Sequence, residues 1–168
     1  MNLFLFVLIP LVISNVLHMV IVGRNALARW QVPISRRWFG GNKTLRGFIV
    51  LPTLNAAAAS LLQPLMPELG IAEAAAHGGM IGLVYLLAEL PTSFIKRRLG
   101  IPPGGRPQRY RLLCMLLDKS DSVIGIVLYG ALAYDLPWTL LVPSGMAAVG
   151  LHLAISALLV RTRVKASL

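Results

Sequence analysis

Long stretches without charged side chains constrain this chain more than any other feature of its sequence. The first 23 residues contain no Lys, Arg, Asp or Glu, and about 20 apolar residues in a helix are enough to cross the hydrocarbon core of a bilayer. Similar apolar stretches recur along the chain, so the sequence predicts an all-α integral membrane protein with five transmembrane helices in a single polytopic domain, residues 1–168. The expected spans are residues 3–22, 48–64, 72–94, 112–134 and 138–160.

The composition agrees with a membrane protein. Hydrophobic residues make up 57% of the chain and charged residues 13%, against about 25% charged residues in soluble domains. No basic residue precedes Arg24, so the first stretch lacks the basic segment of a cleaved secretory signal and is expected to be retained as the first span. The net charge of +10 would suggest nucleic acid for a soluble chain. Here the basic residues follow the membrane spans, and no nucleic-acid partner is expected.

The basic residues are concentrated in alternate connections between the expected spans. The loops at residues 23–47 and 95–111 each hold six basic and no acidic residues, and three more basic residues lie in the tail at 161–168. Under the positive-inside rule, both loops and the C-terminus are cytoplasmic and the N-terminus is outside. We therefore expect a multi-pass protein of the cell (inner) membrane whose functional face is cytoplasmic.

Acidic residues lie near the same face. Asp118 and Asp121 are three residues apart, which places their side chains on one side of a helix with Cβ atoms about 5–6 Å apart. Glu89 precedes Lys96 by seven residues, roughly 10 Å along a helix, so we expect it at a similar depth. Charges near a bilayer need compensation, and an aspartate pair can hold Mg²⁺, which takes its other ligands from water and substrate. A structural salt bridge from Lys119 or Arg111 to the pair is the alternative.

The first basic loop ends in Gly40–Gly47, read GGNKTLRG. Its glycines allow backbone amides to approach an anion, while Lys43 and Arg46 supply positive charge, so the segment is a candidate phosphate cradle. It is not a P-loop, because Asn42 stands where that motif has glycine.

The second basic loop opens with Lys96, Arg97 and Arg98. Nucleotidyl or phosphoryl transfer needs carboxylates that hold a metal ion and basic groups that neutralise the remaining phosphate charge. The acids and the two basic loops together predict a charged vestibule for a polyphosphate with its metal. The alternative for both loops is that they only obey the positive-inside rule. The three histidines are scattered, and we expect them to be packed helix residues.

Three stretches together resemble a known family. They are GGNKTLRGF at residues 40–48, SFIKRRLGIPPG at 93–104 and LLDKSDSVIG at 116–125, and they are similar in order and position to motifs of CDP-archaeol synthases, five-span membrane cytidylyltransferases that are also recognised in bacterial sequences. The resemblance implies transfer of a cytidylyl group from CTP to a membrane lipid phosphate, giving a CDP-lipid and pyrophosphate with Mg²⁺ as cofactor. The lipid is expected to be an archaeal-type ether lipid phosphate or a related one.

The resemblance also assigns roles by position. Archaeal members usually have glycine, aspartate and histidine before the lysine that matches Lys43, and an aspartate near Glu89, so this chain is more similar to the bacterial branch. Asp118 and Asp121 are the expected metal ligands. The expected catalytic residues are Lys43, Arg46, Lys96, Arg97, Asp118 and Asp121, and the expected substrate-binding residues are Gly41, Asn42, Thr44, Glu89 and Arg98.

Other functions remain open at this point. A small transporter or accessory subunit could use the acids as an ion path, although its site is expected near the bilayer midplane rather than at one face. A CDP-alcohol phosphotransferase needs two further aspartates, but no acid follows Asp121 until Asp135. A receptor for anionic lipid would leave the acids unexplained. The oligomeric state is also open, because Gly78, Gly79 and Gly82 can pack within one chain or between two.

Overall fold

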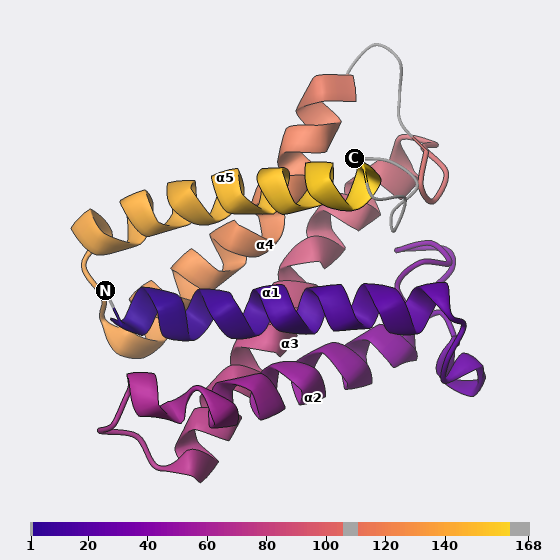
Figure 1. The fold of residues 1–168 in the computed structure, drawn as a ribbon. Helices are drawn as coiled ribbons and strands as arrows, with labels where there is room; N and C mark the ends of the chain where they lie inside the picture. Colours follow the sequence, from indigo (N-terminus) through magenta and orange to yellow (C-terminus); the bar gives the residue numbers. More distant parts are fainter. Residues whose placement is uncertain (1, 106–110, 162–168) are drawn as a thin grey trace.

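The computed structural model describes residues 2–105 and 111–161, and these are helical with short connections and without β-strands (Figure 1). Two 3-10 helices, η1 (Ala28–Trp30) and η2 (Gln63–Leu65), lie in the connections. The described α-helices, in chain order, are α1 (Asn2–Gly23), α2 (Leu45–Leu61), α3 (Ile71–Arg98), α4 (Arg111–Tyr134) and α5 (Trp138–Arg161).

Each of the five predicted apolar segments coincides with a helix, so the all-α prediction is confirmed for the described residues. Length and composition qualify three of the described helices as membrane spans, over Leu3–Gly23, Ile71–Arg98 and Trp138–Ile155. The apolar helices Leu45–Leu61 and Ser120–Tyr134 are shorter. The predicted number of five spans and their orientation therefore stay predictions.

Two helices continue beyond the predicted span boundaries at the basic loops. The second helix begins at Leu45, so Arg46 lies in its first turn rather than in a loop that ends at residue 47. The third helix continues to Arg98 instead of ending at residue 94. It ends in a Schellman motif, in which Gly100 has φ +72° and the Ile101 amide donates to the Lys96 carbonyl. Basic residues in a last helical turn also interact favourably with the helix dipole.

The end of α2 differs from the prediction as well. The helix stops at Leu61 rather than at residue 64, and η2 follows it. Pro64 lies in this 3-10 turn and has no amide hydrogen to continue an α-helix.

Helices α2 and α3 pack closely through small residues. A Cβ atom added to Gly78 would lie 2.4 Å from the Ala59 Cβ, and one added to Gly82 would lie 2.9 Å from the Pro52 Cα. The buried Asn55 donates from Nδ2 to the Gly78 carbonyl over 2.6 Å. These glycines therefore pack within the chain, which is one of the two possibilities left open by the sequence.

Helices α3 and α4 also approach each other closely. A Cβ atom added to Gly125 would lie 2.3 Å from the Ala88 Cβ. Figure 1 shows α4 connected to α5, which returns across the molecule, while α1 lies alongside α2. Helices α1, α3, α4 and α5 together line one large cavity.

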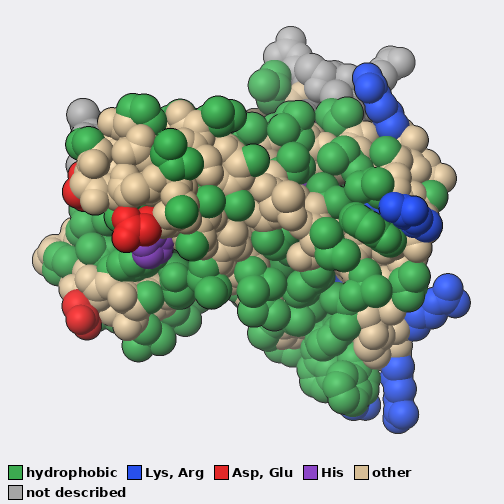
Figure 2. Space-filling view, turned by 90° about the horizontal axis from the view of Figure 1, so that it is seen from below, with side chains coloured by type: hydrophobic (Ala, Val, Ile, Leu, Met, Phe, Trp, Pro, Cys, Tyr) green, Lys and Arg blue, Asp and Glu red, His purple; other side chains and the backbone are tan. Residues whose placement is uncertain are grey.

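Charged side chains divide between the two ends of the molecule. Figure 2 shows Lys and Arg side chains at one end of the face in view, Asp and Glu side chains at the other, and a hydrophobic surface between them. The basic end holds the loop after α1 and the end of α3, where Arg24, Arg29, Arg36, Arg37 and Arg98 are exposed. The predicted cytoplasmic placement of Arg106 and Arg109 in the second loop and of the tail at 162–168 concerns residues outside the described part.

Candidate active site

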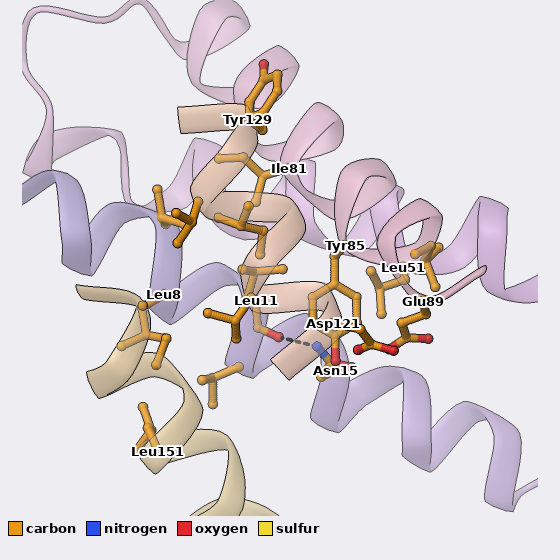
Figure 3. A pocket seen from close by; sticks show the side chains of 18 of the residues that line it. Leu8, Leu11, Asn15, Leu51, Ile81, Tyr85, Glu89, Asp121, Tyr129 and Leu151 are labelled. Carbon is orange, nitrogen blue, oxygen red and sulfur yellow. Dashed lines mark hydrogen bonds between the residues drawn. The ribbon is translucent and has the colours of Figure 1, made fainter. Parts of the chain in front are cut away.

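A cavity of about 1060 Å³ extends along α1, α3, α4 and α5 and reaches both basic loops. Figure 3 shows its two kinds of wall: Glu89 and Asp121 lie close together, while Leu8, Leu11 and Leu151 line an apolar portion on α1 and α5. A cavity with charged groups at one end and apolar groups along its length suits an amphiphilic ligand. The polar lining at the charged end comprises Asn42, Lys43, Glu89, Thr92, Ser93, Lys96, Arg97, Asp118 and Asp121.

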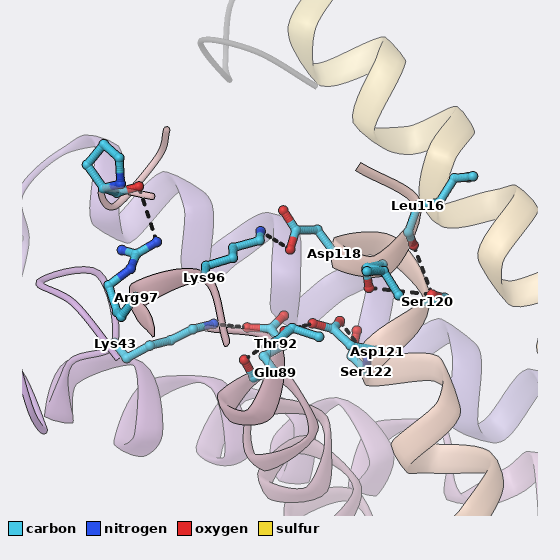
Figure 4. Close-up of polar contacts among 12 residues, drawn as sticks. Lys43, Glu89, Thr92, Lys96, Arg97, Leu116, Asp118, Ser120, Asp121 and Ser122 are labelled. Carbon is cyan, nitrogen blue, oxygen red and sulfur yellow. Dashed lines mark hydrogen bonds and ion pairs between the residues drawn. The ribbon is translucent and has the colours of Figure 1, made fainter. Parts of the chain in front are cut away.

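The first loop contributes Lys43, whose ammonium group forms an ion pair with the Glu89 carboxylate on α3. The loop is held locally by two backbone hydrogen bonds of 2.9 Å, from the Ile34 amide to the Lys43 carbonyl and from the Leu45 amide to the Val32 carbonyl. The Lys43 and Glu89 side chains are 19% and 21% exposed. The pair, whose two side chains face each other in Figure 4, is therefore partly shielded from solvent where it lines the cavity.

A second ion pair joins α3 to α4. The Lys96 ammonium group contacts Oδ1 of Asp118, whose side chain is 43% exposed. Sequence reasoning considered Lys119 or Arg111 as partners of the aspartates, but those side chains lie outside the described part of the structure. The Lys96 contact shows that the acidic pair and the second basic cluster face each other.

Asp121 is oriented by hydrogen bonds from two helices. Its Oδ2 accepts a hydrogen bond of 2.5 Å from the Thr92 hydroxyl on α3, and its Oδ1 accepts one of 2.7 Å from the Ser122 amide (Figure 4). Asp121 is only 9% exposed, and a buried carboxylate needs such donors because it has lost most of its hydration. As the three-residue spacing predicts, Asp118 and Asp121 line the same cavity.

Arg97 connects the two basic loops. Its Nη2 donates to the Pro102 carbonyl over 3.1 Å, and its guanidinium group lies against Gly40, where an added Cβ would be 2.7 Å from Nη1. Gly40 has φ +86°. Within the described part of the chain, the buried Nε of Arg97 has no hydrogen-bond acceptor. Arg97 therefore places a positive charge at the cavity, and its Nε–H group is available to donate a hydrogen bond to a ligand.

Some predicted site residues lie away from the cavity. Arg46 is 3% exposed and donates from Nη1 to the Ala26 carbonyl over 3.0 Å, so it supports the base of the first loop. Arg98 is exposed and lies 5.0 Å from the centre of the Phe94 ring. Thr44 is buried at the N-terminus of α2. The predicted residues that do not line the cavity are Gly41, Thr44, Arg46 and Arg98.

Thr92 was not among the residues predicted from the sequence, and Gly40 was predicted only as part of the phosphate cradle. The spacing of Glu89, Thr92 and Lys96 is three and then four residues, which places all three on one helix face. That periodicity was the available signal for Thr92. No sequence signal indicated that Gly40 would lie under the Arg97 guanidinium.

The donor atoms determine which metal the site could hold. Among the described residues, no group of three or more His, Cys, Asp or Glu side chains is arranged to hold a metal ion. Asp118 and Asp121 offer only oxygen ligands on one wall of the cavity. Two carboxylates fit Mg²⁺, which commonly takes one or two from the protein and completes its shell with water and phosphate oxygens.

Comparison with known proteins identifies similar chains. A family model described as CarS-like, CDP-archaeol synthase, matches residues 1–167. The CDP-archaeol synthase of Aeropyrum pernix is 33% identical over 153 residues, which cover 89% of this chain and 82% of the relative. That of Pyrococcus furiosus is 39% identical over 72 residues, 41% of this chain and 42% of the relative. No solved structure matches the chain.

Proposed function

Because the chain belongs to the CDP-archaeol synthase family, we propose that it transfers a cytidylyl group from CTP to an archaeal-type ether lipid phosphate or a closely related lipid phosphate. Family membership makes the chain a CTP-dependent membrane transferase of lipid biosynthesis and favours an enzyme over a transporter or accessory subunit. The observation that carries the proposal is one cavity whose charged end, with Lys43, Lys96, Arg97, Asp118 and Asp121, continues into an apolar portion.

The two parts of the cavity match the two parts of the lipid substrate. The apolar wall on α1 and α5, with residues such as Leu11 and Leu151, can accommodate hydrocarbon chains without exposing them to water. The lipid phosphate would then lie at the charged end, beside the triphosphate of CTP. An apolar wall accepts ether-linked and ester-linked chains alike, so the lipid is identified by experiment.

The proposed reaction is an in-line displacement at the α-phosphorus of CTP. An oxygen of the lipid phosphate forms a bond to the α-phosphorus. The bond between the α-phosphorus and the oxygen that bridges the α- and β-phosphates breaks, and pyrophosphate leaves. The product is a CDP-lipid. The chain's contribution is to hold two anions together, which requires positive charge around the reacting groups.

The cations of the site are assigned to the phosphates. The ammonium groups of Lys43 and Lys96 reach carboxylates at the charged end, and the same flexible side chains can reach phosphate oxygens there. Arg97 adds the donor Nε. We assign Arg46 to the support of the first loop, because it is buried against the Ala26 carbonyl.

Asp118 and Asp121 are the proposed ligands of Mg²⁺. When bound, the ion would neutralise negative charge on phosphate oxygens and polarise them. The Asp121 carboxylate is held by Thr92 and Ser122, so its orientation is set by the protein before any ligand contact. The Asp118 carboxylate is more exposed and pairs with Lys96.

The proposed topology has five spans in one polytopic domain, with the N-terminus outside and the active face cytoplasmic. Lys43 of the first basic loop pairs with Glu89, and Lys96 at the end of α3 pairs with Asp118, so acids of the cavity lie beside basic residues that the positive-inside rule assigns to a cytoplasmic face. CTP is a cytoplasmic substrate, so this orientation brings it to the charged end of the cavity.

The test is pyrophosphate release by the full-length protein in detergent with Mg²⁺ and CTP. An archaeal-type ether lipid phosphate and a diacyl phosphatidate are compared in parallel, and a sample without lipid gives the background. We expect release that depends on a lipid phosphate and disappears in Asp118→Asn. Failure of every lipid phosphate to elicit release from folded protein would contradict the proposal.

A further inference from the structure

We propose that Thr92 is a positioning residue of the metal site, whose hydroxyl group orients the Asp121 carboxylate toward a divalent cation. The inference rests on the proposed function, because it concerns the same site and takes Asp121 as a metal ligand. Thr92 lines the cavity on α3, whereas Asp121 lies on α4. The hydroxyl group therefore couples the helix of Glu89 and Lys96 to the helix of the aspartates.

The hydrogen-bond geometry assigns the Thr92 hydroxyl hydrogen to Asp121. Thr92 Oγ1 lies 2.5 Å from Oδ2 of Asp121 and 3.1 Å from the Glu89 carbonyl oxygen. A hydroxyl group has one hydrogen to donate, and the shorter contact is to a carboxylate, which is the stronger acceptor. The Ser122 amide holds the other carboxylate oxygen, so Asp121 is fixed at both oxygens.

The Thr92 contact differs from those of two hydroxyl groups in α2. Thr53 donates to the Ile49 carbonyl four residues back over 2.7 Å, and Ser60 donates to the Ala56 carbonyl over 2.9 Å. Such bonds within one helix are the ordinary behaviour of helical Ser and Thr. Thr92 instead reaches a carboxylate on another helix, and this carboxylate faces the cavity.

The packing of α3 against α4 determines the Thr92 contact. The two helices are antiparallel and are in close contact where Ala88 meets Gly125. Thr92 is four residues after Ala88 in α3, and Asp121 is four residues before Gly125 in α4, so one helical turn from this contact the two side chains lie opposite each other. A further turn brings Lys96 to Asp118. The small residues at Ala88 and Gly125 therefore hold Thr92 within hydrogen-bonding distance of the buried acid.

Loss of the hydroxyl group should weaken metal binding rather than destroy the fold. Carboxylates that bind metals are commonly held by hydrogen bonds, and removal of such an outer partner costs about 10–100-fold in metal affinity. Thr92→Val keeps the shape of the side chain and removes the donor. Without it, the Asp121 carboxylate loses a hydrogen bond at Oδ2 and is free to rotate away from the cavity.

The experiment measures Mn²⁺ binding to the full-length protein by electron paramagnetic resonance, in the presence of CTP and without lipid phosphate. The Mn²⁺ that CTP binds without protein is subtracted. We expect Thr92→Val to bind Mn²⁺ about 10–100-fold more weakly than the wild type, and Thr92→Ser, which keeps the hydroxyl group, to bind it nearly as well. Thr53→Val is the matched control, because its hydroxyl group bonds only within α2, and it should leave the affinity unchanged.

A second measurement separates positioning from folding. The Mg²⁺ concentration for half-maximal pyrophosphate release should rise in Thr92→Val and return toward the wild-type value in Thr92→Ser, while a purely structural role would change the thermal unfolding temperature but not this metal dependence. If the Val variant does not fold, Thr92→Ala provides the same loss of the donor. Wild-type Mn²⁺ affinity in a folded variant without the hydroxyl group overturns the role of Thr92.

Asp121→Asn distinguishes this inference from the proposed function. If Asp121→Asn loses Mn²⁺ binding while Thr92→Val retains it, Thr92 has no positioning role and the metal role of Asp121 stands. If Asp118→Asn and Asp121→Asn both retain full Mn²⁺ binding, the metal site of the proposed function is wrong, and the role of Thr92 falls with it.

Discussion

Lys43 and Glu89, which are 46 residues apart in the sequence, form an ion pair that fastens the first basic loop to α3 at the mouth of the cavity. The pair lies on the same cavity wall as Lys96 and Asp118, which form a second ion pair between α3 and α4. Positive and negative groups thus alternate at one end of a cavity whose remaining lining is mostly apolar. A metal-bound triphosphate requires both kinds of group, because carboxylates can bind the metal ion and ammonium groups can neutralise the phosphate oxygens.

The Lys43 and Glu89 pair allows stability and activity to be separated. Lys43→Met should lower pyrophosphate release about 10²-fold, as loss of a preorganised charge in an active site commonly does. It should also lower the thermal unfolding temperature, because the shielded Glu89 carboxylate is left without its partner. Adding Glu89→Gln should restore the unfolding temperature without restoring activity. A double variant that regains activity would show that Lys43 serves only the fold.

Asp118 should be dispensable for folding and essential for turnover. Its side chain is 43% exposed, and ion pairs with an exposed partner contribute about 0–1 kcal/mol to stability. Asp118→Asn should therefore unfold at nearly the wild-type temperature while lipid-dependent pyrophosphate release is lost. Substantial release by this variant at saturating Mg²⁺ would contradict the assignment of Asp118 as a metal ligand.

Gly40 should be required for the placement of Arg97. In Gly40→Ala the new Cβ would lie 2.7 Å from Arg97 Nη1 and 2.9 Å from the Pro103 side chain, so the guanidinium group must move. Gly100→Ala is the matched control, because Gly100 also has a positive φ, +72°, but no atom lies within 4 Å of the added Cβ. Both variants carry the strain of a positive φ, about 1–2 kcal/mol.

We expect Gly40→Ala to raise the KM for CTP and lower the rate, while Gly100→Ala keeps most of its activity. Steady-state kinetics at varied CTP concentration measure the difference. Equal losses in the two variants would mean that backbone strain alone matters, and that Arg97 is not held in place by Gly40.

The neighbouring basic residues Arg97 and Arg98 should differ in their importance for activity. Arg97 lines the cavity, whereas Arg98 is exposed and packs on Phe94. Arg97→Ala should lower kcat/KM for CTP about 10²-fold, and Arg98→Ala should lower it less than about tenfold, through screened long-range charge only. The opposite ranking would mean that the second loop binds its ligand on the outer face of α3.

Much of the fold could be predicted from uncharged stretches and residue spacing in the sequence. Long uncharged stretches require helices in a membrane, because only a helix satisfies its backbone hydrogen bonds within one segment. The three-residue spacing of Asp118 and Asp121 likewise predicts one helix face, and both residues line the cavity. These features depend on local periodicity, which a single sequence records.

The features that a single sequence does not reveal depend on contacts between segments. Arg46 and Lys43 are both basic residues of one motif, yet only the fold shows that Arg46 is buried against Ala26 while Lys43 lies in the cavity. Charge patterns predicted Lys96 in a loop, whereas α3 continues to Arg98 and ends in the Schellman motif at Gly100. The spacing of Glu89, Thr92 and Lys96 places Thr92 on the same helix face as the other two, but its partner Asp121 follows only from the packing of α3 on α4.

The most direct test of cytidylyl transfer by this protein follows the phosphorus atoms of CTP. Full-length protein is incubated with Mg²⁺ and an archaeal-type ether lipid phosphate, using CTP labelled either at the α-phosphate or at the γ-phosphate, and the lipid is extracted. Cytidylyl transfer predicts that only the α-label enters the lipid, in a product that also contains cytidine, and that Asp118→Asn abolishes it. Transfer of the γ-label to the lipid, or no transfer of either label by folded protein with any lipid phosphate, would contradict the proposal that this protein is a lipid-phosphate cytidylyltransferase.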